Sequence, residues 1–189
     1  MAKKAKREEH VAVCVVQRRA CEATPLTDHV LLLAKRPEQG LLAGLWEFPS
    51  VSVAAEASAD DRRQALDSLL DDMGLGGVVG RSWRVVHRRD VGSVMHIFSH
   101  IRMTLHVEHL LVEGDAQDIK TEGGGSMGES QELTWVTHKA LCEGGHKLSG
   151  APSKVFATVN ARGSKGSKVT KGGAKENARI TSFFTKANS

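Results

Sequence analysis

Hydrophobic and polar positions divide the chain into short strand-like runs separated by loops and a few helices. The continuous apolar, β-branched runs at 11–16 and 30–34 predict two buried strands. Further strands are predicted at 45–48, 83–86, 94–107 and 132–136. The segments 21–28 and 117–130 are polar or rich in glycine, so both are predicted to be loops.

One helix has a clear start and a clear stop. Ser58 is a good N-cap, Asp61 occupies the acidic position of a capping box, and Gly74 favours a C-terminal stop. The apolar residues between them lie at helical spacing on one face: Ala65, Leu66, Leu69, Leu70 and Met73. A short helix is predicted after Thr137 and a last one at 153–159. Strands mixed with helices in this order predict an α+β or α/β fold with helices packed on a sheet.

The composition excludes several classes of protein. The 189 residues are 40% hydrophobic and 25% charged, which is typical of one globular domain with a tail. No apolar run approaches the roughly 18 residues of a membrane-spanning helix, and we expect no secretory signal in the charged N-terminus. The three cysteines, Cys14, Cys21 and Cys142, are too few and too far apart for a disulfide scaffold or a four-cysteine iron–sulfur or zinc site.

The basic charge is concentrated at the C-terminus. Residues 161–189 carry seven Lys or Arg side chains and one Glu, a net charge of +6, so the rest of the chain sums to −2 of the total +4. Gly, Ser and Lys dominate 162–175, which therefore cannot bury enough apolar surface to fold. We predict a disordered basic tail at 161–189, in which the adjacent Phe183 and Phe184 have no core to enter.

A ten-residue run at 40–49, GLLAGLWEFP, is the most distinctive part of the sequence. By its composition alone it predicts a loop that enters a core strand. The run resembles the start of the C-terminal domain of MutY-type adenine DNA glycosylases, and the basic residues at 3–7 resemble the approach to that domain. The resemblance implies a Nudix-like α/β/α sandwich with a mixed sheet, related to MutT. It divides the chain into a basic linker at 1–9, the Nudix-like domain at 10–160 and the tail at 161–189.

A MutT-like domain can also be a pyrophosphohydrolase, whose Nudix box binds divalent metal ions through helix carboxylates. Aligning that box on the predicted helix places Asp71 and Asp72 at two Glu positions and Ser68 at a third. Asp is one methylene shorter than Glu, and Ser has no carboxylate, so we predict a structural helix without a metal site. A stand-alone hydrolase of oxidised nucleotides is the alternative, and Mg²⁺-dependent release of pyrophosphate would distinguish it.

The segment 94–101 predicts, from its residues alone, a half-buried strand with two histidines and no third zinc ligand nearby. The resemblance assigns Phe98, Ser99 and His100 to the loop that recognises 8-oxoguanine. A Ser hydroxyl both donates and accepts, so Ser99 is expected to bind O8 and N7–H of the oxidised base, whereas N7 of guanine only accepts. Phe98 is expected to wedge beside the lesion, and His100 to reach a phosphate.

Other basic residues are candidates for phosphate contacts. Arg81, Arg84, Arg88 and Arg89 precede the 94–101 segment, and Lys3, Lys4, Lys6 and Arg7 lie in the predicted linker. Contacts of this kind do not read the base sequence, and they weaken as the salt concentration rises. A solvated charged face is the alternative interpretation of both groups.

The tail ends in a pattern that resembles the box by which many repair proteins bind the sliding clamp PCNA. The aliphatic and aromatic positions match in Ile180, Phe183 and Phe184, whereas Asn177 replaces the usual Gln. The shorter Asn is expected to weaken the hydrogen bonds made at that position. A disordered tail suits this mode of binding, because a short segment folds as it places its apolar side chains in a pocket.

The resemblance also implies what lies outside this sequence. MutY-type enzymes have a catalytic helix-hairpin-helix domain, usually with an iron–sulfur cluster, and no such segment occurs in the 189 residues. We therefore expect no cofactor here and no release of adenine by this chain alone. The predicted partners are PCNA and double-stranded DNA with 8-oxoguanine opposite adenine, in base excision repair. We expect a monomer in the nucleus, with a mitochondrial form left open, and a non-catalytic adaptor between lesion and clamp is a further alternative.

Overall fold

A seven-stranded mixed sheet forms the centre of the computed structural model, which describes residues 6–36, 38, 42–75, 83–114, 132–144, 146 and 148–163. The strands are β1 (Arg7–Arg19), β2 (Val30–Lys35), β3 (Trp46–Glu47), β4 (Ser50–Val53), β5 (Arg84–Ile97), β6 (Ile101–Glu113) and β7 (Leu133–Thr137). The helical elements are the 3-10 helix η1 (Leu26–Asp28), α1 (Ala59–Leu70), the π-helical turn η2 (Asp71–Leu75), α2 (His138–Cys142) and α3 (Gly150–Gly163).

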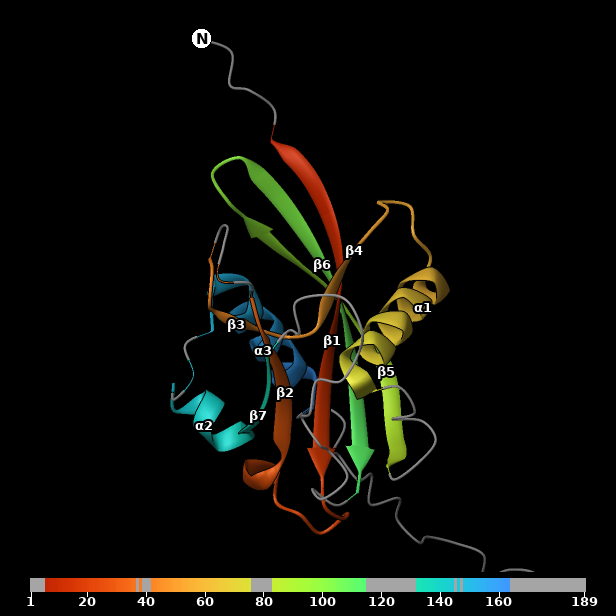
Figure 1. The fold of residues 1–189 in the computed structure, drawn as a ribbon, viewed down its shortest axis with the longest axis vertical. Helices are drawn as coiled ribbons and strands as arrows, with labels where there is room; N and C mark the ends of the chain where they lie inside the picture. The colour runs from red at the N-terminus through yellow and green to blue at the C-terminus, as the bar shows by residue number, and fades with distance from the viewer. Residues whose placement is uncertain are drawn as a thin grey trace, which may run out of the picture.

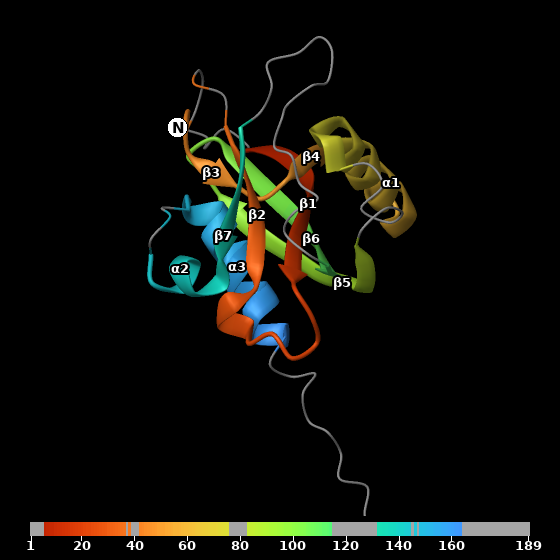
Figure 2. The same cartoon turned by 60° about the horizontal axis from the view of Figure 1, so that its bottom comes forward.

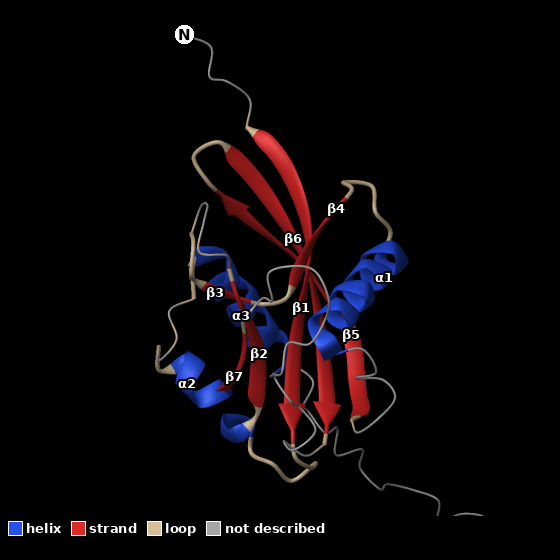
Figure 3. Ribbon diagram, in the orientation of Figure 1, coloured by secondary structure: helices blue, strands red, loops and turns tan. Residues whose placement is uncertain are grey.

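Long strand pairings determine the order of the sheet, which is β3-β2-β1-β6-β5, with β4 paired to β1 and β7 paired to β2. β1 and β6 run parallel over their whole length, from Arg7 opposite Ile101 to Arg19 opposite Glu113. The other pairings are antiparallel, so the predicted mixed sheet is confirmed. Figure 3 shows the long strands of this sheet between the helices.

Helices cover both faces of the sheet, with α1 on one side and α2 and α3 on the other (Figures 1 and 2). Residues alternate between the faces of a strand, so Ala12, Cys14 and Val16 of β1 pack on one side with Leu66 and Leu70 of α1. Val13 and Val15 pack on the opposite side with Val155 of α3. The predicted α/β/α sandwich is thereby confirmed. No helix among the described residues is long and apolar enough to cross a membrane.

The start of α1 has the predicted capping box. Ser58 Oγ accepts from the Asp61 amide at 3.1 Å, and Asp61 Oδ2 accepts from the Ser58 amide at 2.9 Å. These reciprocal bonds satisfy two backbone donors that a helix leaves without partners at its N-terminus. The helix gives way to η2 after Leu70, and Gly74, at a φ of 76°, then redirects the chain as predicted.

The two strands predicted at 83–86 and 94–107 are wrong in their boundaries. β5 is continuous through the polar residues between them, because register shifts at Val85/His87 and Asp90/Gly92 accommodate the irregular pattern. The predicted strand at 94–107 is instead two strands joined by a turn. β4 was not predicted, β1 begins inside the predicted 1–9 linker, and α3 is longer than the predicted 153–159 helix.

A chain of hydrogen-bonded polar side chains lies on the α3 side of the sheet and runs from His87 of β5 to His29, just before β2. His109 Nε2 lies 2.7 Å from Gln17 Oε1, and Gln17 Nε2 lies 2.7 Å from His29 Nδ1. His87 Nε2 lies 3.2 Å from His109 Nδ1, and His29 Nε2 lies 3.1 Å from the Thr24 carbonyl. Because an amide oxygen only accepts and an amide nitrogen only donates, one chain of neutral rings satisfies every member, with His87 as the first donor.

This line of neutral histidines predicts a loss of stability in mild acid. Burial is the main cause that lowers the pKa of His29 and His87, and it lowers that of His109 to about 3. Below pH 6.5, His109 therefore binds a proton in the unfolded chain but not in the folded one. The free energy of unfolding consequently decreases as the pH is lowered. The His109 contribution to that loss is about 2 kcal/mol at pH 5.

Urea unfolding at pH 7.5 and pH 5.0 measures this loss in the parent protein and in His109→Gln. The variant retains an uncharged polar side chain but removes the titrating ring. We expect its loss between the two pH values to be smaller by about 2 kcal/mol, whatever its stability at pH 7.5. An equal loss in both proteins would contradict the assignment.

Candidate nucleic-acid interface

The turn between β5 and β6 presents the three residues Phe98, Ser99 and His100. The Phe98 amide donates to the Ile101 carbonyl at 2.8 Å and closes the turn. Ser99 and His100 are exposed, whereas Phe98 is half-buried. The structure thus brings the three predicted lesion-reading residues together at one end of the sheet, in a hairpin that extends beyond the helices (Figure 1).

The first residues of β1 hold this turn from the side. The Arg7 amide donates to the His100 carbonyl at 3.0 Å, as the last bond of the parallel β1–β6 ladder. Lys6 Nζ donates to the Phe98 carbonyl at 3.1 Å. Both residues were predicted to belong to a linker, so their contact with the turn was missed. A parallel pairing between segments more than ninety residues apart leaves no local signal in the sequence.

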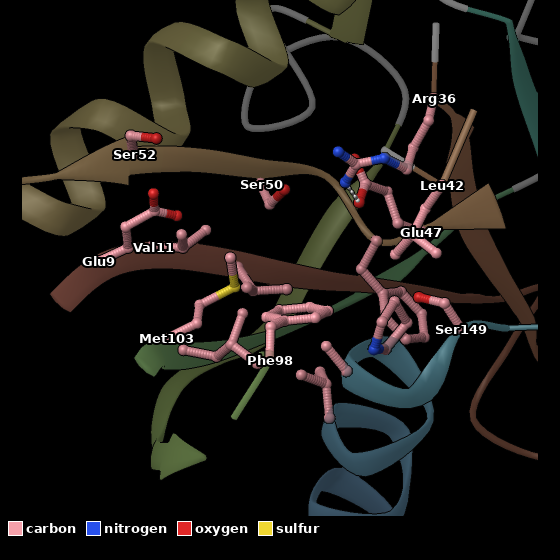
Figure 4. Close-up of a pocket in the computed structure, with 16 residues that line it drawn as sticks. Glu9, Val11, Arg36, Leu42, Glu47, Ser50, Ser52, Phe98, Met103 and Ser149 are labelled. Atoms are coloured by element: carbon pink, nitrogen blue, oxygen red, sulfur yellow. Dashed lines mark hydrogen bonds and ion pairs between the residues drawn. The ribbon is translucent and has the colours of Figure 1, made fainter. Parts of the chain in front are cut away.

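Phe98 lies between the turn and a cavity of about 240 Å³ on the α3 side of the sheet (Figure 4). Its ring meets the His96 ring edge-on, with 4.5 Å between the ring centroids. Met103 lines the same cavity, and Ser149 lies beside it at the start of α3. Across the cavity, Arg36 Nη1 donates to Glu47 Oε2 at 2.7 Å. The arrangement gives Phe98 a packed edge and an open side.

Two exposed apolar side chains flank the turn. Met95 and Ile97 are 54% and 53% exposed, and the only other large hydrophobic residue this exposed in the described chain is Leu26, at 55%. They lie two residues apart on β5, so they share one face of this edge strand. Adjacent exposed apolar residues next to a polar turn are typical of a contact surface. The sequence reasoning missed them, because their exposure depends on which face of β5 is covered, and the neighbouring Val94 packs against the core on the other face.

Arg84 and Arg88 are placed away from the turn. A strand rises about 3.3 Å per residue, so Arg88 is roughly 30 Å along β5 from Phe98. Its side chain is 15% exposed and donates to Asp67 Oδ1 at 2.6 Å and to Glu108. Arg84 is 65% exposed, and it pairs with Glu113 at 2.7 Å at the far end of the hairpin. Neither arginine shares a surface with Ser99.

The other predicted interface residues lie outside the described residues. These are Arg81, Lys3 and Lys4 for DNA, and Asn177, Ile180, Phe183 and Phe184 for the clamp.

The residues of α1 do not fit the metal site of a Nudix hydrolase. Asp67 is already paired with Arg88, and Ser68 supplies no carboxylate. Within the described ranges, no group of three or more His, Cys, Asp or Glu side chains is arranged to hold a metal ion. Glu108, on β6 beneath the helix, accepts from both Arg63 and Arg88. The charged groups here attach α1 to the sheet.

Residues 26–155 match the model of the NUDIX domain family. The chain belongs to the NUDIX domain family. Its membership agrees with the layers and the mixed sheet described above, and it confirms the family expected from the 40–49 run.

Curated relatives of the chain are adenine DNA glycosylases. The Arabidopsis thaliana protein is 40% identical over 133 residues, which cover 68% of this chain and 20% of the relative. The Rattus norvegicus protein is 35% identical over 165 residues, which cover 86% of this chain and 28% of the relative. The chain therefore spans less than a third of these relatives, and the predicted resemblance to the MutY-type family is confirmed over that part.

Solved structures show the same fold. A crystal structure of the C-terminal domain of mouse MUTYH in complex with human PCNA has a TM-score of 0.58 and 27% identity, covering 84% of this chain and 91% of that one. The NUDIX domain of Shewanella oneidensis NrtR, complexed with ADP ribose, has a TM-score of 0.54 at 12% identity, covering 85% and 90%. The second likeness supports the fold alone.

Arg88 is largely buried among its partners, whereas Arg84 is exposed, so the two arginines are expected to contribute differently to stability. Arg88→Met removes the partner of Asp67 and one of the two arginine partners of the buried Glu108 carboxylate, which keeps Arg63, so we expect a loss of about 2 kcal/mol in the free energy of unfolding. Arg84→Met is the matched control, because its pair is exposed and Glu113 retains Arg19. We expect the control to lose less than about 1 kcal/mol.

Urea unfolding of both variants at neutral pH provides the comparison. Similar losses in the two variants would show that the Arg88 cluster does not hold α1 to the sheet.

Proposed function

We propose that this chain is the 8-oxoguanine-reading part of an adenine DNA glycosylase, and that it reads the lesion with the β5–β6 turn. The observation that carries the proposal is the exposed Ser99–His100 tip beside Phe98, in a chain similar to adenine DNA glycosylases. The parent protein would remove adenine paired with 8-oxoguanine. We place the catalytic step in a part of the parent protein outside this chain, since the chain spans only 20–28% of the length of these relatives.

The Ser99 hydroxyl has the chemistry that distinguishes the two bases. It accepts a hydrogen bond from N7–H of 8-oxoguanine and donates one to O8, whereas guanine has neither group. The exposed tip allows an approach to a base edge without any movement of the sheet. A pair of hydrogen bonds of this kind contributes about 1–3 kcal/mol of discrimination.

The neighbours of Ser99 supply contacts that do not depend on the base sequence. Phe98 has an open side toward the cavity, so its ring can change rotamer without rearranging the core, and it can then enter a base step as an apolar wedge. The apolar Met95 and Ile97 lie on the strand that leads to this ring. His100 is exposed beside Ser99, where it can reach a phosphate.

Replacing the Ser99 hydroxyl tests the reading of the lesion. We expect Ser99→Ala to reduce the preference for 8-oxoguanine–adenine over guanine–adenine duplexes by roughly 5- to 150-fold, because both hydrogen bonds are lost. Fluorescence anisotropy with the two duplexes at one salt concentration measures the ratio of dissociation constants. Ser93→Ala, which is also exposed on β5, is the matched control and should keep the parent ratio. An unchanged ratio in Ser99→Ala would rule out this role.

We also propose that the tail binds the PCNA sliding clamp. The proposal is supported by the mouse MUTYH domain, which was solved in complex with human PCNA, and by the box at 177–184. Ile180, Phe183 and Phe184 would enter an apolar pocket, while the basic residues around them would meet an acidic surface. A nuclear location and an iron–sulfur cluster in an upstream domain stay predictions.

The two phenylalanines provide the test of clamp binding. We expect the double variant Phe183→Ala, Phe184→Ala to weaken the affinity for PCNA by roughly 30-fold or more, since buried aromatic anchors contribute at least about 2 kcal/mol. Surface plasmon resonance with immobilised PCNA measures the change. The double variant Thr185→Ala, Asn188→Ala lies outside the box and is the control. Equal affinity in the phenylalanine variant and the parent would show that the box is not used.

A further inference from the structure

The lesion-reading turn is built from two distant parts of the chain. Ser99 is followed by His100, whose carbonyl accepts from the Arg7 amide, and is preceded by Phe98, whose carbonyl accepts from Lys6 Nζ. The peptide units on both sides of the Ser99–His100 tip are therefore held by the first residues of β1. Within the turn itself, the Phe98 amide donates to the Ile101 carbonyl.

The orientation of a hydroxyl depends on the peptide units around it. The Phe98 carbonyl and the Ser99 amide belong to one planar peptide unit. A hydrogen bond that holds the carbonyl therefore also holds the amide nitrogen and Cα of Ser99. Reading two neighbouring atoms of one base requires the reading group to lie within about 0.5 Å of its correct position. Exposed turns are usually the mobile parts of a fold, so this one needs support from outside the hairpin.

We propose that Lys6 and Arg7 are positioning residues of the reading turn, and that they couple lesion recognition to the segment that enters β1. This inference rests on the proposed function of the turn. Lys6 acts through its ammonium group on the Phe98 carbonyl, and Arg7 acts through its backbone amide on the His100 carbonyl. A change in the direction from which the chain enters β1 is thereby transmitted to Ser99 within a few residues.

A paired substitution at Arg7 isolates the backbone contact. Arg7→Pro removes the amide that donates to His100, and proline is tolerated at the first residue of a strand. Arg7→Ala is the matched control, because it removes the same side chain, and its ion pair with Glu9, but retains the amide. The difference between these two variants reports the loss of the amide together with the restriction that proline places on the backbone of Arg7 and Lys6.

Hydrogen exchange of the DNA-free protein tests the positioning directly. We expect the Phe98 amide, which closes the turn, to exchange roughly fivefold faster or more in Arg7→Pro than in Arg7→Ala, because the turn loses an external support. Equal exchange rates would overturn the positioning role. This measurement does not depend on any lesion, so it decides the structural claim even if the turn does not read 8-oxoguanine.

Binding to two duplexes tests the coupling to recognition. The ratio of dissociation constants for guanine–adenine and 8-oxoguanine–adenine duplexes is expected to fall roughly 2- to 10-fold in Arg7→Pro relative to Arg7→Ala. Lys6→Met is expected to lower the same ratio, and Lys6→Arg, which keeps a cationic donor, is expected to restore part of it. If Lys6 only contacted a phosphate, Lys6→Met would weaken both complexes equally and leave the ratio unchanged, which would overturn its positioning role.

The two experiments separate the possible failures. A parent protein with no preference between the duplexes would refute the proposed function while the exchange rates still decided the positioning. A parent protein with a clear preference that is identical in Arg7→Pro, Arg7→Ala and Lys6→Met would refute the coupling and leave the proposed function intact.

Discussion

The parallel pairing of β1 with β6 is the constraint on which the rest of the structure depends. It runs over all thirteen residues of both strands and holds β1 inside the sheet, where side chains pack against both of its faces. Parallel strands of this kind are buried on both sides, which explains why the middle of β1 is apolar without alternation. The same pairing ends at the β5–β6 turn, because Arg7 lies opposite Ile101. The core and the proposed reading site are thus two ends of one ladder.

The charged groups around α1 form ion pairs that attach the helix to the sheet. Glu108 lies under the helix and accepts from Arg63 and Arg88, and Arg88 also binds Asp67. A carboxylate that is neutralised by arginine in a largely buried cluster is a poor ligand for a hard cation. These contacts attach α1 to the sheet, whereas the proposed reading turn lies at the opposite end of β5 and β6.

Local features of this fold could be predicted from the sequence, and non-local ones could not. Ser58 and Asp61 predict the start of α1, because a capping box is complete within four consecutive residues. The Phe98–His100 turn contains no glycine or proline, so periodicity merges β5 and β6 into one strand, and only a family resemblance identified the loop. The sequence does not show that Arg84 is exposed and Arg88 is largely buried, because α1, which is distant in the sequence from β5, covers only Arg88.

The position of the turn follows from what recognition and stability each require. A base edge can be reached only by side chains that lie outside the two helical layers. Ser99 and His100 meet that condition, because the β5–β6 hairpin extends beyond the helices. Such a hairpin buries little apolar surface of its own, and it would open easily if it were attached by β5 and β6 alone. Adding β1 as a third strand supplies the missing support without covering the tip. The hairpin can therefore be both exposed and ordered, as the proposed reading of one oxidised atom of a base requires.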